Sequence, residues 1–156
     1  MDIKLARIDN RLLHGVVASQ WAPVSQCDRV MVIDDVVAND PAKKDAMRIS
    51  KPAGKALSII STETAVTNFK SGRYEGKNIL LIVKKPAVLK VLKDNGISIE
   101  KINLGGSAFL PDETIEITKR VFVSEADLAI YHEFQEAGTV VSAQYTPSDN
   151  EQLLTK

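Results

Sequence analysis

The sequence of 156 residues has a single cysteine, Cys27, and only two histidines, His14 and His132. One cysteine excludes an intrachain disulfide, and without a CxxC or Cys/His cluster the sequence predicts no metal site. Lys plus Arg and Asp plus Glu each total 20, so the formal net charge is zero. Composition therefore does not indicate nucleic acid as a partner. The longest purely aliphatic run, Ile79 to Val83, is too short to span a bilayer.

What remains is the composition of an ordinary soluble globular protein, with 44% hydrophobic and 26% charged residues. The length predicts one domain over residues 1–156, long enough to bury a single core. The chain passes from Met1 directly into a strand pattern, without an apolar stretch behind a basic start. We therefore expect no signal peptide and a cytoplasmic protein, whose contact with any membrane is made through a partner.

Seven short runs of β-branched or aliphatic residues are typical of strands, and several lack polar alternation, as strands buried on both faces do. They are Ile3 to Ile8, Val30 to Ile33, Leu57 to Ile60, Ile79 to Val83, Ile102 to Leu104, Val121 to Val123 and Val140 to Ala143. Strands that alternate with helices predict an α/β fold: a single-domain, open, doubly wound and mostly parallel sheet with helices on both faces.

Helix signals lie between these runs, as capping residues, prolines at first turns and glycines beyond last turns. They are Asn39 or Asp40 before Pro41, Ser61 or Thr62 with Gly72 beyond, Pro86 to Asn95 with Gly96 beyond, and Ser124 with Asp127 and Gly138. The tail from Pro147 to Lys156 is predicted to form one short terminal helix.

In such a fold, ligands bind beyond the carboxyl ends of the strands. The stretch RIDNRLLHGVV, residues 7–17, places His14 there, between the first strand and a helix whose Leu13, Val17 and Trp21 lie on one face. His14 can act as base, ligand or nucleophile, and all three roles are open at this point. His132, in mid-helix, is expected to face solvent.

The surroundings of His14 suit an anion. The helix that follows offers unpaired backbone N–H groups, Gly15 allows close approach of the backbone, and Arg11 supplies a planar cation. Asp9 can orient the imidazole ring or Arg11. The alternative is that these residues form only a solvated turn with one ion pair, and spacing alone does not decide between the two.

RIDNRLLHGVV resembles the motif, close to R-I-D-D-R-L-I-H-G-Q-V, of the IIB subunits of the mannose/fructose/sorbose family of the bacterial phosphoenolpyruvate-dependent sugar phosphotransferase system. Later blocks of the chain resemble the family in the same order. They are DRVMVIDDVVANDP (28–41), RYEGKNILLIVKKP (73–86) and KINLGG (101–106). The resemblance covers most of the chain, and its first block is specific.

The resemblance implies a phosphotransferase that acts as a phosphoryl carrier. His14, through its Nδ1 nitrogen, would accept a phosphoryl group from a phosphohistidine on a IIA domain and pass it to a sugar held by membrane IIC and IID subunits. Arg11, Asn10 and Gly15 would bind the phosphate, and Asp9 would set its geometry, with no cofactor or metal required. Mannose, fructose, sorbose and N-acetylhexosamines all fit this family, and a homodimer is left open.

Two positions depart from the family motif. Asn10 stands where a second aspartate is common, which removes one negative charge near the phosphoryl group and should reduce repulsion slightly. Val16 stands where glutamine is usual, so an amide near the phosphate is replaced by a residue with no expected role beyond packing.

Other residues near the strand ends are weaker candidates. Asp34 and Asp35 are expected to be loop or helix-start acids rather than partner contacts. Gly105 and Gly106 lack the pattern of a nucleotide loop, although they would allow close backbone approach to a phosphate. Trp21 is assigned to the core or to a docking contact, and Lys84 and Lys85 to solvated ends of a strand.

Two rival functions use the same residues. The first is a non-catalytic sensor or regulatory module that binds a phosphorylated metabolite at the same edge of the sheet. The second is a small hydrolase or isomerase with His14 as base, which needs a second catalytic group that the sequence does not supply.

Overall fold

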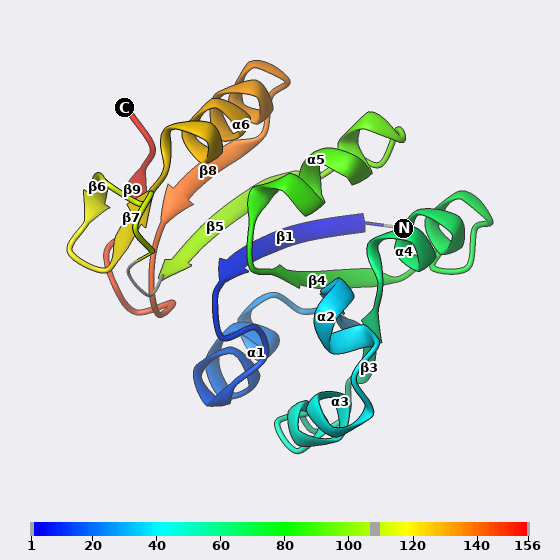
Figure 1. Cartoon of the computed structure of the whole chain (residues 1–156). Helices are drawn as coiled ribbons and strands as arrows, with labels where there is room; N and C mark the ends of the chain where they lie inside the picture. The colour runs from blue at the N-terminus through cyan, green and yellow to red at the C-terminus, as the bar shows by residue number, and fades with distance from the viewer. Residues whose placement is uncertain (1, 107–109, 156) are drawn as a thin grey trace.

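The computed structural model describes residues 2–106 and 110–155, and it has the predicted α/β architecture, a mostly parallel sheet with helices on both faces (Figure 1). The strands are β1 (Asp2–Asp9), β2 (Arg29–Ile33), β3 (Ala56–Ile60), β4 (Asn78–Val83), β5 (Lys101–Gly106), β6 (Ile115–Thr118), β7 (Val121–Val123), β8 (Val140–Ala143) and β9 (Gln152–Leu153). The helices are η1 (Val17–Trp21), α1 (Ala22–Val24), α2 (Asp35–Ala38), α3 (Pro41–Arg48), α4 (Thr62–Lys70), α5 (Pro86–Asp94) and α6 (Glu125–Glu136).

The main sheet has the strand order β3-β2-β4-β1-β5-β8-β9. The pairs from β3 to β8 are parallel, and β9 runs antiparallel to β8. β1 therefore lies between β4 and β5, and its carboxyl end opens onto the edge where loops from several strands meet. The topology places Asp9 and His14 at this edge, as the sequence predicts.

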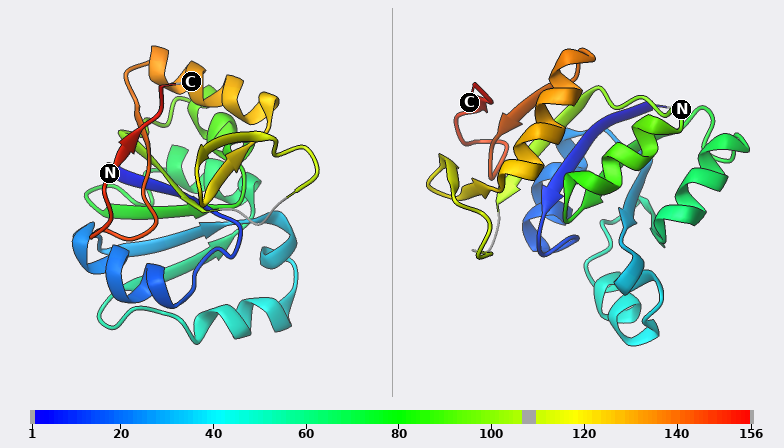
Figure 2. Two further views of the ribbon diagram at one scale, coloured as in Figure 1. Left: turned by 90° about the vertical axis from the view of Figure 1, so that its left-hand side faces the viewer. Right: turned by 45° about the horizontal axis from the view of Figure 1, so that its top comes forward.

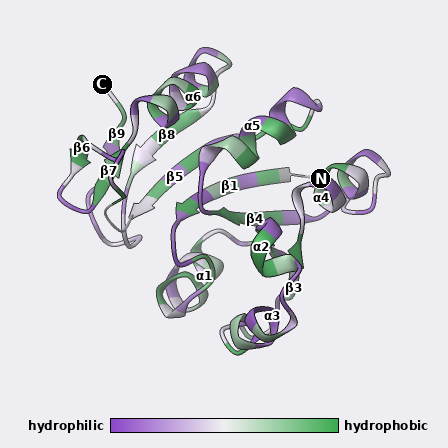
Figure 3. Ribbon diagram, viewed as in Figure 1, coloured by the Kyte–Doolittle hydropathy of each residue, from purple (hydrophilic) through white to green (hydrophobic). Residues whose placement is uncertain are grey.

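Two apolar clusters form the core, one on each face of the sheet. On one face, α4, α5 and α6 pack through Phe69, Leu89 and Phe134. On the other face, the segment that follows β1 packs through Leu13, Val17 and Trp21. Figure 2 shows the two helical layers on either side of the sheet, and Figure 3 shows hydrophobic residues concentrated in the central strands.

The helix starts follow the predicted capping residues. The side chains of Asp40, Ser61 and Ser124 accept hydrogen bonds from the backbone N–H groups of Lys43, Thr64 and Asp127. Each cap satisfies an amide that has no acceptor within its helix. Gly72, Gly96 and Gly138 follow the helix ends with positive φ, which a residue without Cβ adopts at least cost.

Two predictions about secondary structure are wrong. Instead of a terminal helix, the tail forms β9, and Leu154 donates its N–H to Val141 at 2.9 Å while its side chain is buried. The open edge of β8 presents N–H and C=O groups with which the tail can pair. A short isolated helix, by contrast, is only marginally stable in water. The Val121–Val123 run joins an unpredicted strand, β6, in a separate antiparallel hairpin rather than the main sheet.

Candidate functional site

His14 lies in a sharp turn between β1 and η1. The turn is closed by the Leu12 N–H, which donates to the Asp9 carbonyl at 3.0 Å. Leu12 has a φ of 58°, a conformation that costs a leucine about 1–2 kcal/mol, and its buried side chain holds it there. The carbonyl of His14 accepts the N–H of Ala18 at 2.9 Å, so the helical segment begins directly after His14.

Asp9 fixes the imidazole ring. Its Oδ2 lies 2.8 Å from Nε2 of His14 and 3.1 Å from Nε of Arg7, while Oδ1 accepts the backbone N–H of Arg11 at 2.9 Å. Because the carboxylate only accepts hydrogen bonds, Nε2 carries the proton and donates it to Asp9. In the neutral ring, the other nitrogen, Nδ1, then holds a lone pair. The His14 side chain is 14% exposed, whereas that of Asp9 is 3% exposed.

A buried arginine supports Asp9 from inside the sheet. Arg7 is 0% exposed, and its guanidinium also donates to Oδ1 of Asn103 at 2.7 Å and to the carbonyls of Gly105 and Gln144. Burial lowers the pKa of Arg7 from its ordinary value, while the charge and hydrogen bond of Asp9 oppose that shift. Arg7 had no predicted role, although a charged residue inside an apolar strand is a signal of one.

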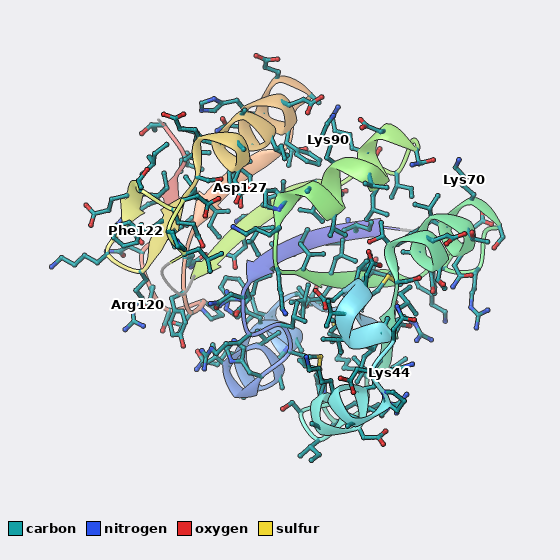
Figure 4. The ribbon with its side chains drawn as sticks, viewed as in Figure 1. Lys44, Lys70, Lys90, Arg120, Phe122 and Asp127 are labelled. Atoms are coloured by element: carbon teal, nitrogen blue, oxygen red, sulfur yellow. The ribbon has the colours of Figure 1, made fainter. Side chains whose placement is uncertain are left out.

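Arg11 extends from the turn over the surface. It is exposed, and its Nη2 donates to the hydroxyl of Tyr145, in the loop after β8, at 2.9 Å. These two residues line a cleft of about 370 Å³ together with Asp9, Asn10, Gly105, Gly106 and Arg120. Figure 4 labels Arg120 in the hairpin, on the side of the molecule where β1 and β5 end. The arginines make this cleft suitable for an anion.

Gly15 borders open space beside His14. The residue is exposed, and a Cβ built on it would meet no atom within 4 Å. Packing within the chain therefore does not require glycine here. Asn10 is half-buried and lines two clefts. One is the cleft beside Arg11, and the other, of about 300 Å³, lies on the face of α5 and α6.

A family model described as the PTS system sorbose subfamily IIB component matches residues 3–156. The chain belongs to this family. It is thus a IIB component of a sugar phosphotransferase system, and such components are phosphotransferase components.

Relatives of this IIB component agree with the assignment. It is 32% identical to the fructose-specific EIIB component of Bacillus subtilis (strain 168), over 96% of its own length and 91% of that protein's. It is 28% identical to the mannose-specific EIIAB component of Escherichia coli (strain K12) and spans 46% of that longer chain. The crystal structure of the IIBSor domain of the sorbose permease from Klebsiella pneumoniae matches with a TM-score of 0.88 and 28% identity, covering 97% and 92% of the two chains.

Asp34 and Asp35 have structural partners in this IIB component. Asp34 caps α2 by accepting the N–H of Val37 at 3.0 Å, and Asp35 accepts the N–H of Thr62 at 2.7 Å. This agrees with the prediction that they are helix-start or loop acids. Their carboxylates tie β2 and α2 to the start of α4.

Gly105 has a packing requirement of its own. A Cβ at this position would collide with the guanidinium of Arg7, whose Nη2 donates to the Gly105 carbonyl at 3.2 Å. The buried arginine thus explains the glycine without a ligand. Gly106 has a φ of 136° and packs beside the Tyr145 ring, and it lines the cleft beside Arg11.

The remaining candidates are placed as follows. Trp21 is in the core, with its Nε1 donating to the carbonyl of Tyr145 at 2.9 Å. Lys84 is exposed, whereas Lys85 forms ion pairs with Asp127 at 3.1 Å and Glu113 at 3.6 Å, so the expectation of a simply solvated Lys85 is wrong. His132 is half-buried rather than facing solvent, because α6 packs against the sheet.

Within residues 2–106 and 110–155, no group of three or more His, Cys, Asp or Glu side chains is arranged to hold a metal ion. Over the same residues, no helix is long and apolar enough to cross a membrane.

Proposed function

We propose that this IIB component is a cytoplasmic phosphoryl carrier over residues 1–156, with Nδ1 of His14 as the acceptor. The observation that carries the proposal is the 2.8 Å contact between Nε2 of His14 and Oδ2 of Asp9. This contact commits one ring nitrogen to the protein and leaves the other with a lone pair for phosphorus. A carboxylate that orients a histidine through its far nitrogen is a recurrent arrangement in nucleophilic catalysis.

In the proposed step, the lone pair of Nδ1 forms a bond to the phosphorus of a phosphohistidine on a IIA domain. The donor P–N bond breaks, and its electron pair returns to the donor imidazole. The Nε2 proton stays on His14, where Asp9 stabilises the positive charge that develops on the ring. Arg11, Asn10 and the first amides after Gly15 would bind the phosphoryl oxygens. Positioning and charge stabilisation are the main requirements of such a transfer.

The second transfer would deliver the phosphoryl group to a sugar held by membrane IIC and IID subunits. The P–N bond to His14 breaks, its electron pair returns to Nδ1, and the sugar hydroxyl forms the new P–O bond as it releases its proton to solvent. The name of the Escherichia coli relative joins IIA and IIB components in one chain, which supports a IIA partner here. Contact with the membrane would be peripheral, through the partner subunits.

The test is the intact mass of the protein before and after incubation with phosphoenolpyruvate, the general energy-coupling proteins and a cognate IIA. We expect one phosphoryl group on wild-type protein, acid-labile and alkali-stable, mapped to His14, and none on His14→Ala. The matched control is His132→Ala, at the other histidine, which should be phosphorylated as wild type.

Phosphorylation retained by a folded His14→Ala variant would overturn the proposal. Reversible binding of a phosphorylated metabolite, with no covalent change in mass, would instead support the sensor function.

A further inference from the structure

Tyr145 lines the same cleft as Asp9 and Arg11, although it is far from the motif in sequence. It belongs to the loop after β8, and its hydroxyl accepts the 2.9 Å hydrogen bond from Nη2 of Arg11, 134 positions earlier. Nothing in the sequence pattern associates the two residues. The order of the strands brings them together, because β8 lies beside β5, which lies beside β1.

The tyrosine is itself firmly held. Its carbonyl accepts the Nε1 proton of buried Trp21 at 2.9 Å. The guanidinium carbon of Arg120, from the hairpin, lies 4.5 Å from the centroid of the Tyr145 ring, and that of Arg7 lies 5.8 Å from it. Cation–π contacts at such distances are attractive, so two further segments of the chain fix the ring.

Arg11, by contrast, is an exposed side chain with many rotamers. Fixing such a side chain costs conformational entropy. Because Tyr145 is already held in place, its hydrogen bond restricts Arg11 beforehand, and Arg11 then loses less entropy when it binds an anion. Arg11 and Arg120 line the same cleft as Asp9, whose carboxylate holds His14. The Tyr145 hydroxyl thus fixes one guanidinium nitrogen of Arg11 and leaves the others available to an anion in this cleft.

We infer that Tyr145 is a positioning residue, which acts on phosphoryl transfer by holding the guanidinium of Arg11 beside His14. The inference rests on the proposed role of His14 as acceptor. It makes the hydroxyl, rather than the ring, the functional part of the side chain.

The experiment compares Tyr145→Phe with wild type, using inorganic phosphoramidate as the donor so that no protein partner is needed. In this reaction the P–N bond of phosphoramidate, protonated on its nitrogen, breaks and its electron pair leaves on ammonia, while the lone pair of Nδ1 forms the new bond to phosphorus. The rate of labelling of His14 is followed by mass spectrometry with residue mapping, over a range of donor concentrations. We expect Tyr145→Phe to be about threefold to tenfold slower, which is the effect of losing an ordinary hydrogen bond at a solvent-exposed position.

The chain offers a matched control. Tyr74 also accepts a hydrogen bond through its hydroxyl, from Nδ2 of Asn68 at 2.9 Å, and has Arg29 5.9 Å from its ring centroid. It lies beyond α4, away from His14. Tyr74→Phe should label at the wild-type rate. Tyr145→Phe should keep the wild-type Tm, because the ring and its contacts remain.

A second variant separates positioning from a general structural effect. In an Arg11→Gln background, adding Tyr145→Phe should cause no further loss of rate, because the tyrosine acts through the arginine. An equal loss in both backgrounds would overturn the inference, as would an unchanged or faster rate in Tyr145→Phe alone. Absence of label on His14 in wild-type protein, with phosphoramidate and with phosphorylated IIA as donor, would instead overturn the proposed function itself.

Discussion

The carboxyl edge of the sheet carries two polar clusters, one on each face, and each is built around a cation. On the face of η1, Arg7 is 0% exposed and bonds to Asp9 and Asn103. On the face of α5 and α6, the side chain of Lys85 is 36% exposed and pairs with Asp127 and Glu113. The cation of the first cluster is buried among protein acceptors, whereas the second shares its cation with solvent.

This difference explains why the turn at His14 has a fixed geometry. In a site closed to water, every donor and acceptor must be matched within the protein, so Asp9 has one place to lie. That place determines which nitrogen of His14 is tied. A cluster open to water can exchange partners at small cost, so the Lys85 cluster connects α5 to α6 without fixing a side chain so tightly.

Replacing Arg7 is the strongest test of the difference between the two clusters. Arg7→Met leaves Asp9, Asn103 and two carbonyls without their buried donor, so the free energy of unfolding should fall by about 3–5 kcal/mol. Urea denaturation measures this. The control, Lys85→Met, should lose at most about 1 kcal/mol. Similar losses in the two variants would show that the clusters do not differ as described.

Asp9→Asn tests whether the buried cluster around Arg7 is needed for the proposed phosphorylation of His14. An amide retains the shape of the side chain but no longer holds the imidazole in the same protonated form, so phosphorylation of His14 should slow by about 100-fold or more. Asp127→Asn, in the open cluster, should label at the wild-type rate. Circular dichroism confirms folding of both variants, and a small effect of Asp9→Asn in folded protein would contradict the proposed orientation.

Close packing around Arg7 is tested at Gly105. The Cβ of Gly105→Ala would displace the guanidinium, with an expected loss of about 1–3 kcal/mol of stability. Gly15→Ala has free space for its Cβ, so its stability should change by less than about 0.5 kcal/mol. Phosphorylation of Gly15→Ala should nevertheless be slower, because the methyl group occupies space proposed for the phosphoryl group. Thermal unfolding and His14 labelling, measured on both variants, separate the two kinds of glycine.

The smallest effect concerns pH. Burial on its own lowers the pKa of Lys85, but the hydrogen bond and charge of Asp127, with the charge of Glu113, outweigh it, so the pKa is raised. A raised pKa in the folded state contributes stability fully present below about pH 10.4 and lost as pH rises through the folded pKa. Solvent screening limits this to a few tenths of a kcal/mol. Comparing wild type with Lys85→Met from pH 9 upward measures it, and a gain of stability over that range would contradict the sign.

Local patterns predicted much of the fold. Buried parallel strands were recognisable from β-branched runs, and helix starts from Asp40, Ser61 and Ser124, because caps act within three residues. The tail was mispredicted because the deciding contacts lie outside it. Glu151 pairs with Lys101 and accepts from Ser142, and Leu154 bonds to Val141.

The candidate site divides in the same way. Asp9, Arg11, His14 and Gly15 are close in sequence, so one strand-to-helix turn places them together. Their chemical roles stay predictions until His14 is tested for phosphorylation. Arg7 was overlooked because its partners come from β5 and the loop after β8, and Tyr145 because it lies 134 positions from Arg11.

The sequence alone was enough to predict the family, most of the order of strands and helices, and the turn that carries His14 to the edge of the sheet. The family was predicted from a specific motif, whereas the elements and the turn were predicted from backbone preferences and caps, which act over a few residues. Only the tertiary structure decided which nitrogen of His14 is tied, what fills the interior beneath Asp9, and where Arg11 is held. Arg7 and Arg11 are held by hydrogen bonds to residues about a hundred or more positions away, which pair only once the sheet has set its strand order. Asp9, which bonds to His14, is positioned in turn by its bond to Arg7.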